Sequence, residues 1–195
     1  MDAIAGEDGW LRCPWALSAL EYRDYHDLEW GQPVTTSQGL YERLTLEAFQ
    51  SGLSWITILR KRDNFRAAFA GFDPDVVASF DGGDVERLMS DAGIVRNRTK
   101  IDAAINNAKV VAGLGPGFAD LVLSFAVADR PRPSSLAEVP ASTAESINLA
   151  KTLKSLGVRF VGPTTAYALM QAVGLVDDHL TECFVQIDRR GLPGS

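Results

Sequence analysis

The cysteines and histidines of this chain lie in two pairs, one near each end. The 195 residues contain two of each type, at Cys13 and His26 and at His179 and Cys183. Thiolate and neutral imidazole are ligands that Zn²⁺ favours, and a complete Cys₂His₂ set describes a closed, structural site. His179 and Cys183 are four residues apart, so one helical turn would direct both toward the same point. A zinc ion bound by all four would hold the N-terminal segment against the C-terminal segment.

Two other interpretations of these residues remain open. Cys13 and Cys183 could be small buried apolar groups, with both histidines on the surface, since neither pair has the CxxC spacing of a zinc ribbon. A Cys13–Cys183 disulfide is the second. The acidic start, MDAIAGEDGW, lacks the regions of a signal peptide, and no apolar run is long enough to span a bilayer. We therefore expect a soluble, cytoplasmic protein, in which thiols stay reduced and bind metal in preference to forming disulfides.

Composition favours one domain with a single core. The chain is 46% hydrophobic, and no low-complexity stretch or long linker divides it. The formal net charge of −6 argues against bulk affinity for nucleic acid, because a typical nucleic-acid-binding domain is basic. Solvated surface is the simplest interpretation of the basic clusters. These clusters are Arg60, Lys61 and Arg62, then Arg96, Arg98 and Lys100, and finally Lys151, Lys154 and Arg159.

Helical signals dominate, so the predicted fold class is all-α. Thr36 or Ser37 can cap a helix that runs to a break near Gly52. Asp73 and Thr99 are the expected caps of two later helices, and Ser142 with Glu145 fits a capping box. Strand-like sequence is confined to short fragments such as residues 158–161. Further helices are expected at residues 53–59, 74–80, 84–92, 99–113, 117–128, 142–157 and 163–174.

One acidic residue breaks the helical pattern. Glu47 lies three residues after Leu44, on the apolar stripe of its own helix. A buried carboxylate must be paired, be protonated or face a cavity that a ligand fills, and an arginine partner and a binding pocket explain it equally well. Tyr22, Tyr25 and Trp55 lie nearby in the sequence, although aromatic residues at such spacing are more often core. A carboxylate among aromatic rings would suit a flat, cationic, nitrogen-rich ring.

The sequence GVRFVGP at 157–163 joins two of the expected helices. Gly157 and Gly162 permit a tight turn, and the N-terminus of the next helix offers free N–H groups to an anion. Such a hairpin could hold a phosphate backbone without reading bases. An ordinary interhelical turn is the commoner explanation of the same pattern.

Five segments gain meaning when they are taken together. They are RCPWA at 12–16, YHDLEWG at 25–31, LTLEAFQSGLSWITILRKRDNFRAAF at 44–69, DAGIVRNRTKI at 91–101 and FVGPTTAYALMQAVGLVDDH at 160–179. In this order they resemble the DNA-3-methyladenine glycosylase I family of helix-hairpin-helix repair enzymes, over about residues 12–183. The resemblance implies one all-α glycosylase domain at residues 1–195, with a core at about 12–184 between a short N-terminal extension and a C-terminal tail.

The resemblance also implies a metal site and a base pocket. Members of the family bind a structural zinc, whose ligands match the four cysteines and histidines. Glu47 matches the glutamate that recognises the base and contributes to catalysis. Tyr25 and Trp55 match aromatic residues of the pocket, and Tyr22 matches a neighbouring one. The implied zinc ligands are Cys13, His26, His179 and Cys183.

Further residues match positions that contact DNA. Leu53, beside Gly52, matches the region that probes the gap left by an extruded nucleotide. The hairpin would hold the DNA backbone. Its candidate DNA-binding residues are Gly157, Arg159, Gly162 and Thr164.

The implied reaction is hydrolysis of the N-glycosidic bond of N3-methyladenine in alkylated double-stranded DNA, by a monomer with no membrane or protein partner. Glu47 would favour the charge of the cationic base after the nucleotide is flipped. Asp177 would either steady the developing oxocarbenium ion or order the loop beside His179, and we prefer the second role. The main alternative is a non-catalytic, zinc-stabilised protein that binds damaged DNA. A zinc hydrolase would need an open metal position, which four protein ligands disfavour.

Overall fold

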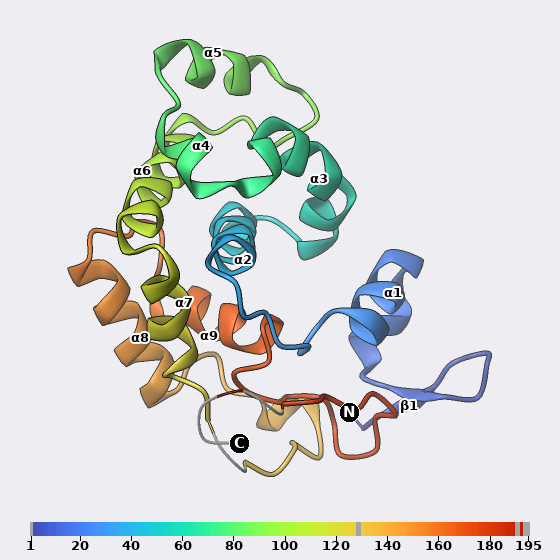
Figure 1. Cartoon of the computed structure of the whole chain (residues 1–195). Helices are drawn as coiled ribbons and strands as arrows, with labels where there is room; N and C mark the ends of the chain where they lie inside the picture. Colours follow the sequence, from blue (N-terminus) through green and yellow to red (C-terminus); the bar gives the residue numbers. More distant parts are fainter. Residues whose placement is uncertain (1, 128–129, 190–191, 193–195) are drawn as a thin grey trace.

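The structure, a computed structural model, describes residues 2–127, 130–189 and 192 and is built mainly from helices (Figure 1). This confirms the all-α prediction. Within the described residues, strands are limited to one antiparallel pair, β1 (Ile4–Ala5) and β2 (Leu11–Arg12), which sequence analysis did not predict. No described helix has both the length and the apolar character needed to cross a membrane. The α-helices are α1 (Leu20–Leu28), α2 (Ser37–Gln50), α3 (Trp55–Ala68), α4 (Pro74–Ala78), α5 (Gly82–Ser90), α6 (Arg98–Leu114), α7 (Pro116–Leu123), α8 (Ala144–Ser155) and α9 (Pro163–Ala172), and the 3₁₀ helices are η1 (Pro14–Ser18), η2 (Ala70–Phe72) and η3 (Leu136–Glu138).

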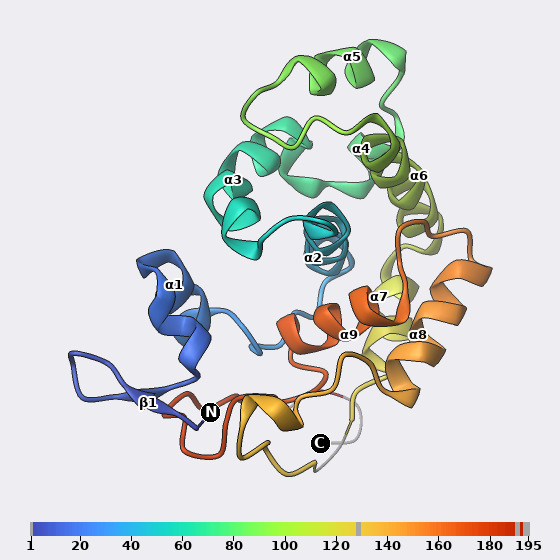
Figure 2. The ribbon, with the colours of Figure 1, turned by 180° about the vertical axis from the view of Figure 1, so that it is seen from behind.

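Helix α2 is the centre of the molecule. It contacts α3, α6, α7 and α9, and it lies between the α3–α6 region and the α7–α9 region in both views (Figures 1 and 2). The predicted apolar stripe is confirmed, because Leu40 and Leu44 are fully buried in the main core. Phe49, near the end of α2, packs edge-on against Phe65 of α3, with ring centroids 4.8 Å apart.

Side-chain caps begin several of these helices. Thr36 caps α2 and Asp73 caps α4, as predicted. Helix α6 begins earlier than expected, because the Asn97 side chain, not that of Thr99, accepts a hydrogen bond from the Lys100 N–H at 3.1 Å. Both residue types can cap a helix, and which of two neighbours does so depends on where the preceding chain enters.

Three further expectations need correction. The capping box of α8 joins Thr143 to Ser146, one residue later than the predicted pairing of Ser142 with Glu145. Helix α5 begins at Gly82, because Asp81 caps it. The helix expected at residues 117–128 ends at Leu123, and position 128 lies outside the described residues.

Residues 158–161 form the connection between α8 and α9, so the strand-like interpretation was wrong. The side-chain amide of Asn107 donates to the Arg159 carbonyl at 3.0 Å and accepts from the Arg159 N–H at 2.8 Å. Asn106 donates to the Gly157 carbonyl at 2.8 Å. Two side chains of α6 therefore take the place of a neighbouring strand.

The two ends of the chain meet in a second, smaller core. Cys13 from the N-terminal segment packs there with Leu180, Cys183 and Val185. The Phe184 N–H donates to the Leu11 carbonyl at 2.9 Å, which ties the C-terminal segment to β2. The predicted contact between the two ends is therefore present.

Glycine is required where α9 ends. Gly174 has a φ of +75°, and a Cβ atom there would lie 2.4 Å from the Gly31 carbonyl oxygen. This close approach brings the segment after α1 against the end of α9, where the Gly31 N–H donates to the Ala172 carbonyl at 3.4 Å.

We expect Gly174→Ala to lower the free energy of unfolding by at least about 1–3 kcal/mol, because the new side chain is strained and meets backbone. Gly113→Ala is the matched control, since Gly113 lies inside α6 and a Cβ atom added there would meet no atom within 4 Å beyond its own helix backbone. It should stabilise the protein by about 0.5–1 kcal/mol. Urea unfolding of both variants measures the difference, and equal effects would contradict the proposed constraint.

Candidate functional site

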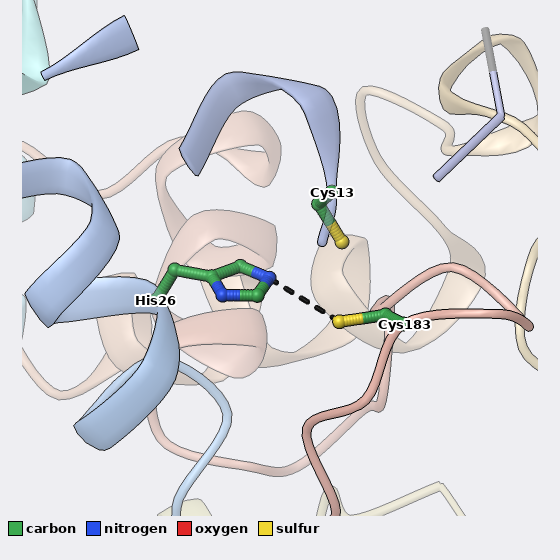
Figure 3. A group of neighbouring side chains, drawn as sticks. All are labelled: Cys13, His26 and Cys183. Carbon is green, nitrogen blue, oxygen red and sulfur yellow. Dashed lines mark hydrogen bonds between the residues drawn. The ribbon is translucent and has the colours of Figure 1, made fainter. Parts of the chain in front are cut away.

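Three of the four predicted metal ligands form a buried group. Cys13 precedes η1, His26 lies on α1 and Cys183 lies in the C-terminal segment (Figure 3). One ligand atom of each lies within 4.8 Å of the others, and Cys183 Sγ is 3.4 Å from His26 Nε2. The group therefore joins three segments that are far apart in the sequence.

His179, the fourth predicted ligand, lies beside this group. Its ring centroid is 5.0 Å from that of His26, and its Nε2 is buried without a hydrogen-bond partner among the described residues. Its Nδ1 is 3.0 Å from Asp177 Oδ1, and His26 Nδ1 is likewise 2.8 Å from Asp27 Oδ1. Carboxylates at Nδ1 leave both Nε2 atoms free to bind a metal, a common arrangement around zinc. The donor types and the orphaned Nε2 fit a zinc ion.

The expected helical turn between His179 and Cys183 is wrong. Residues 175–189 contain no described helix. The segment instead turns back on itself, with the Cys183 N–H donating to the Leu180 carbonyl at 2.9 Å and the Leu180 N–H donating to Cys13 Sγ at 3.4 Å. Spacing alone could not distinguish this turn from a helix.

A cavity of about 390 Å³ opens between α1, α2, α3 and α9. Glu47 of α2 lies in its wall, and most of the larger side chains around it are aromatic. These are Trp15, Tyr22, Tyr25, Trp30 and Trp55. The structure thus brings together all four residues that sequence analysis assigned to a base pocket.

No described residue forms an ion pair with Glu47. Glu47 is 7% exposed, and no described residue donates a hydrogen bond to its carboxyl group. The nearby Arg43 instead pairs with Glu29, at 3.0 Å between Nη2 and Oε2. Burial raises the pKa of Glu47 to about 8, although the charge of Arg43 partly opposes the shift. Of the two explanations left open by the sequence, the structure therefore favours the pocket.

The aromatic walls are held by contacts with one another and with backbone. The rings of Tyr25 and Trp55 lie 5.5 Å apart at 50°. The Tyr22 hydroxyl accepts a hydrogen bond from the Ile56 N–H at 3.0 Å, which joins α1 to the start of α3. Burial, with a smaller contribution from Glu47, raises the pKa of Tyr25, so this phenol stays neutral at physiological pH.

Sequence analysis missed two tryptophans of the pocket. Trp15 packs edge-on against His26 at 5.1 Å, and Trp30 packs against His179 at 4.6 Å, so both link the pocket to the Cys/His group. A signal was present, because Trp30 follows His26 by four residues and Trp15 follows Cys13 by two. It could not be separated from ordinary core packing.

The loop between α2 and α3 carries Gly52 and Leu53. Gly52 has a φ of +81°, and Leu53 is 41% exposed. Lys100 holds this loop, because its ammonium group donates to the carbonyls of Phe49 at 2.9 Å and Ser51 at 2.6 Å. Burial lowers the pKa of Lys100. Lys100 is therefore a structural residue and not part of a solvated basic cluster.

Gly157, Arg159, Gly162 and Thr164 gather at one hairpin, as predicted, and their contacts with DNA stay a prediction. Arg159 and Thr164 are exposed. The basic cluster at residues 60–62 is mostly engaged by the protein itself. Lys151 and Lys154, on α8 before the hairpin, are exposed.

Asp177 does not line the cavity. Its carboxylate accepts from Arg132 Nε at 2.7 Å and from the His179 backbone N–H at 3.2 Å. Burial opposes ionisation, but the hydrogen bonds with His179 and Arg132 outweigh it and lower the pKa of Asp177. These contacts favour the structural interpretation, while a contribution to catalysis stays a prediction.

Comparison with known proteins agrees with this arrangement. The methyladenine glycosylase family matches residues 15–186, a range that contains every large side chain of the pocket. The chain belongs to this family. It is 48% identical to DNA-3-methyladenine glycosylase 1 of Escherichia coli K12, over 88% of this chain and 95% of the relative. It is 44% identical to DNA-3-methyladenine glycosylase of Haemophilus influenzae, over 88% and 96%.

Solved structures of family members share the fold. A crystal structure of 3-methyladenine DNA glycosylase I has a TM-score of 0.85 and 47% identity, covering 89% of this chain and 98% of the other. The Staphylococcus aureus enzyme has a TM-score of 0.83 and 32% identity, covering 88% and 94%. A variant of 3-methyladenine DNA glycosylase I, solved in complex with 3-methyladenine, matches with a TM-score of 0.83 and 32% identity over 88% and 95%.

The raised pKa of Glu47 predicts a pH-dependent stability. Between pH 4.5 and about 8 the folded protein keeps a proton that the unfolded chain releases, so the free energy of unfolding should fall as pH rises. Glu47→Gln removes this contribution. The free energy of unfolding of the variant minus that of wild type should therefore rise by about 1 kcal/mol per pH unit across this window.

Urea unfolding from pH 5 to 8 measures the effect. Glu42→Gln is the control, because Glu42 lies on the same helix and pairs with Arg66 outside the cavity. Parallel stability profiles for wild type and Glu47→Gln would show that the carboxyl group is not buried as described.

Proposed function

We infer that the protein is a DNA-3-methyladenine glycosylase, which hydrolyses the N-glycosidic bond of N3-methyladenine in alkylated DNA. The observation that carries this inference is the buried carboxyl group of Glu47, which lies without a hydrogen-bond donor in the aromatic cavity of the described structure. Relatives at 44–48% identity bear the name of this activity. A cavity of about 390 Å³ falls within the range of small-molecule sites.

The pocket suits a flat cation. Methylation at N3 gives the adenine ring a positive charge, which the faces of Tyr25 and Trp55 attract. Burial keeps the pKa of Glu47 near 8 when the cavity holds no cation. A cation beside the carboxyl group favours its ionised form and opposes the effect of burial. Base binding and ionisation of Glu47 therefore stabilise each other.

The chemistry of the damaged base explains why one carboxylate suffices for recognition. A cationic base is a good leaving group, so cleavage needs little acid catalysis. The protein must extrude the nucleotide, which is easier where damage has weakened stacking and pairing, and hold the base while water attacks the sugar. An undamaged adenine carries no charge and gains much less from Glu47.

Two exposed elements are suited to contact DNA. Leu53 offers an apolar side chain of the kind that enters the base stack. The hairpin at 157–162 carries the exposed Arg159 and leads into the N-terminus of α9, whose first N–H groups can face a phosphate. Because the net charge is −6, affinity depends on a small basic face and should fall steeply with salt. A monomeric state and the absence of protein partners stay predictions.

The activity is tested by base release from dimethyl-sulfate-treated duplex DNA, resolved by chromatography. Wild type should release 3-methyladenine and leave 7-methylguanine. Glu47→Gln should lower the rate at least about tenfold, because the amide lacks the negative charge that attracts the cationic base and strengthens the hydrogen bonds that the carboxylate accepts. Glu42→Gln, the same chemical change outside the cavity, should keep the wild-type rate. DNA binding without base release would instead identify a non-catalytic damage-binding protein.

We propose in addition that one structural Zn²⁺ binds to the two cysteines and two histidines. Support comes from the buried Nε2 of His179, which lacks a partner among the described residues, and from the carboxylates that fix both imidazoles. With four protein ligands the metal would link the chain ends and leave no position for substrate. The proposed ligands are Cys13, His26, His179 and Cys183.

Elemental analysis tests this proposal without an activity assay. The purified protein should contain about one zinc per chain, and a chelator should lower its melting temperature, because metal binding is coupled to folding. His179→Ala should lose most of the zinc. Thr181→Ala, in the same loop, should keep the zinc, since the Thr181 hydroxyl donates to the Arg132 and Pro133 carbonyls and is not a proposed ligand. A metal-free wild type with an unchanged melting temperature would rule the site out.

A further inference from the structure

A second polar side chain, Gln171 of α9, lines the same cavity as Glu47. Its amide is held by a buried carboxylate, because Gln171 Nε2 donates to Asp178 Oδ2 at 2.8 Å. The Asp178 side chain is fully buried. Neither residue was singled out by the sequence, because both fit an ordinary helix end.

Asp178 is the centre of a charged network. Its Oδ1 forms an ion pair with Arg130, and its Oδ2 also accepts from the Tyr167 hydroxyl at 2.6 Å. Arg130 Nη2 donates to the same hydroxyl at 3.0 Å. A carboxylate paired in this way accepts hydrogen bonds and has none to donate.

This network determines which way the amide of Gln171 faces. An amide carries donors on nitrogen and an acceptor on oxygen, and only its nitrogen can bond to Asp178. The oxygen is therefore turned away from Asp178, and no described residue donates a hydrogen bond to it. Gln50, the other glutamine of the cavity, is held in a similar way, since its Nε2 donates to the Leu53 carbonyl at 3.3 Å.

Purines differ in what they offer such an oxygen. At position 6 adenine carries an amino group, a donor, whereas guanine carries a carbonyl oxygen, an acceptor. When a base fills the cavity, an amide oxygen in the cavity wall pairs with the amino group of adenine and is left facing the carbonyl oxygen of guanine. A ligand that leaves a buried polar group of its site without a hydrogen-bond partner binds much more weakly.

We propose that Gln171, positioned by Asp178, presents its amide oxygen to the 6-amino group of the flipped base and selects N3-alkylated adenine over N3-alkylated guanine. This inference rests on the proposed glycosylase function and names a determinant of its substrate range. Asp178 acts only through Gln171 and is a positioning residue.

The test compares release of 3-methyladenine and 3-methylguanine from methylated duplex DNA, with enzyme in excess. Gln171→Met, which is similar in size but has no amide, should lower the ratio of the two rates at least about tenfold, mainly through slower 3-methyladenine release. Asp178→Asn should also lower the ratio, because an amide at 178 can donate to the Gln171 oxygen. The Gln171 nitrogen can then face the pocket and favour guanine.

Tyr167→Phe is the matched control. It removes the hydrogen bond that the Tyr167 hydroxyl donates to Asp178 Oδ2, but it leaves this oxygen in place as the acceptor that orients Gln171. It should lower the melting temperature and keep the wild-type ratio. Zinc content and melting temperature of all variants separate selectivity from folding, and Gln171→Met decides the question if Asp178→Asn does not fold.

The outcomes distinguish the two levels of inference. If wild type releases no 3-methyladenine, the proposed function fails. If wild type releases it but Gln171→Met keeps the wild-type ratio, the proposed role of Gln171 is overturned and the glycosylase function stands. A ratio that falls as much in Tyr167→Phe as in Asp178→Asn would also overturn it, because loss of network stability would then explain the change.

Discussion

The pocket depends on contact between the first thirty residues and the end of the chain. Trp15, Tyr22 and Tyr25 supply one side of the cavity, whereas Glu47 and Gln171 belong to helices of the main core. The N-terminal segment is held there by the small core around Cys13 and Cys183 and by backbone contacts at the end of α9. If this contact opened, the aromatic walls would separate from the carboxyl group. Recognition would be lost although α2 stayed folded.

Burial of Glu47 joins the energetics of folding to those of binding. Ionisation of a carboxyl group that is buried without a hydrogen-bond donor costs free energy. The empty site avoids this cost because burial raises the pKa of Glu47 and keeps its carboxyl group protonated. A cationic ligand changes the balance, because the same low-dielectric surroundings strengthen its attraction to the carboxylate. A neutral purine meets the cost of ionisation without that compensation. Selection for damaged bases thus depends on the free-energy cost of ionising Glu47, which a cationic base offsets and a neutral base does not.

The sequence predicted what depends on local pattern. Helix periodicity placed Glu47 on a buried stripe, and the caps at Thr36 and Asp73 follow from short-range hydrogen bonds. The sequence-based prediction failed where a side chain distant in the sequence determines the local structure. Lys100 looks like a surface cation but caps α2, and the strand-like hairpin is held by Asn107 of α6. Resemblance to a known family predicted a base pocket from four residues that the structure gathers around one cavity. The orientation of the Gln171 amide, in contrast, requires the positions of Asp178 and its partners.

Helix α6 holds both of the elements proposed to meet DNA. Lys100, in its first turn, holds the loop that carries Leu53, and Asn107, two turns later, holds the hairpin at Arg159. At 1.5 Å per residue the two attachment points are separated by about 10 Å along a rigid rod. The separation of these two attachment points is therefore set by one helix. It is comparable with the length of about three stacked base pairs at 3.4 Å each. If Leu53 and the hairpin both contact DNA, neither the lesion nor the pocket can change the separation of the two points that hold them.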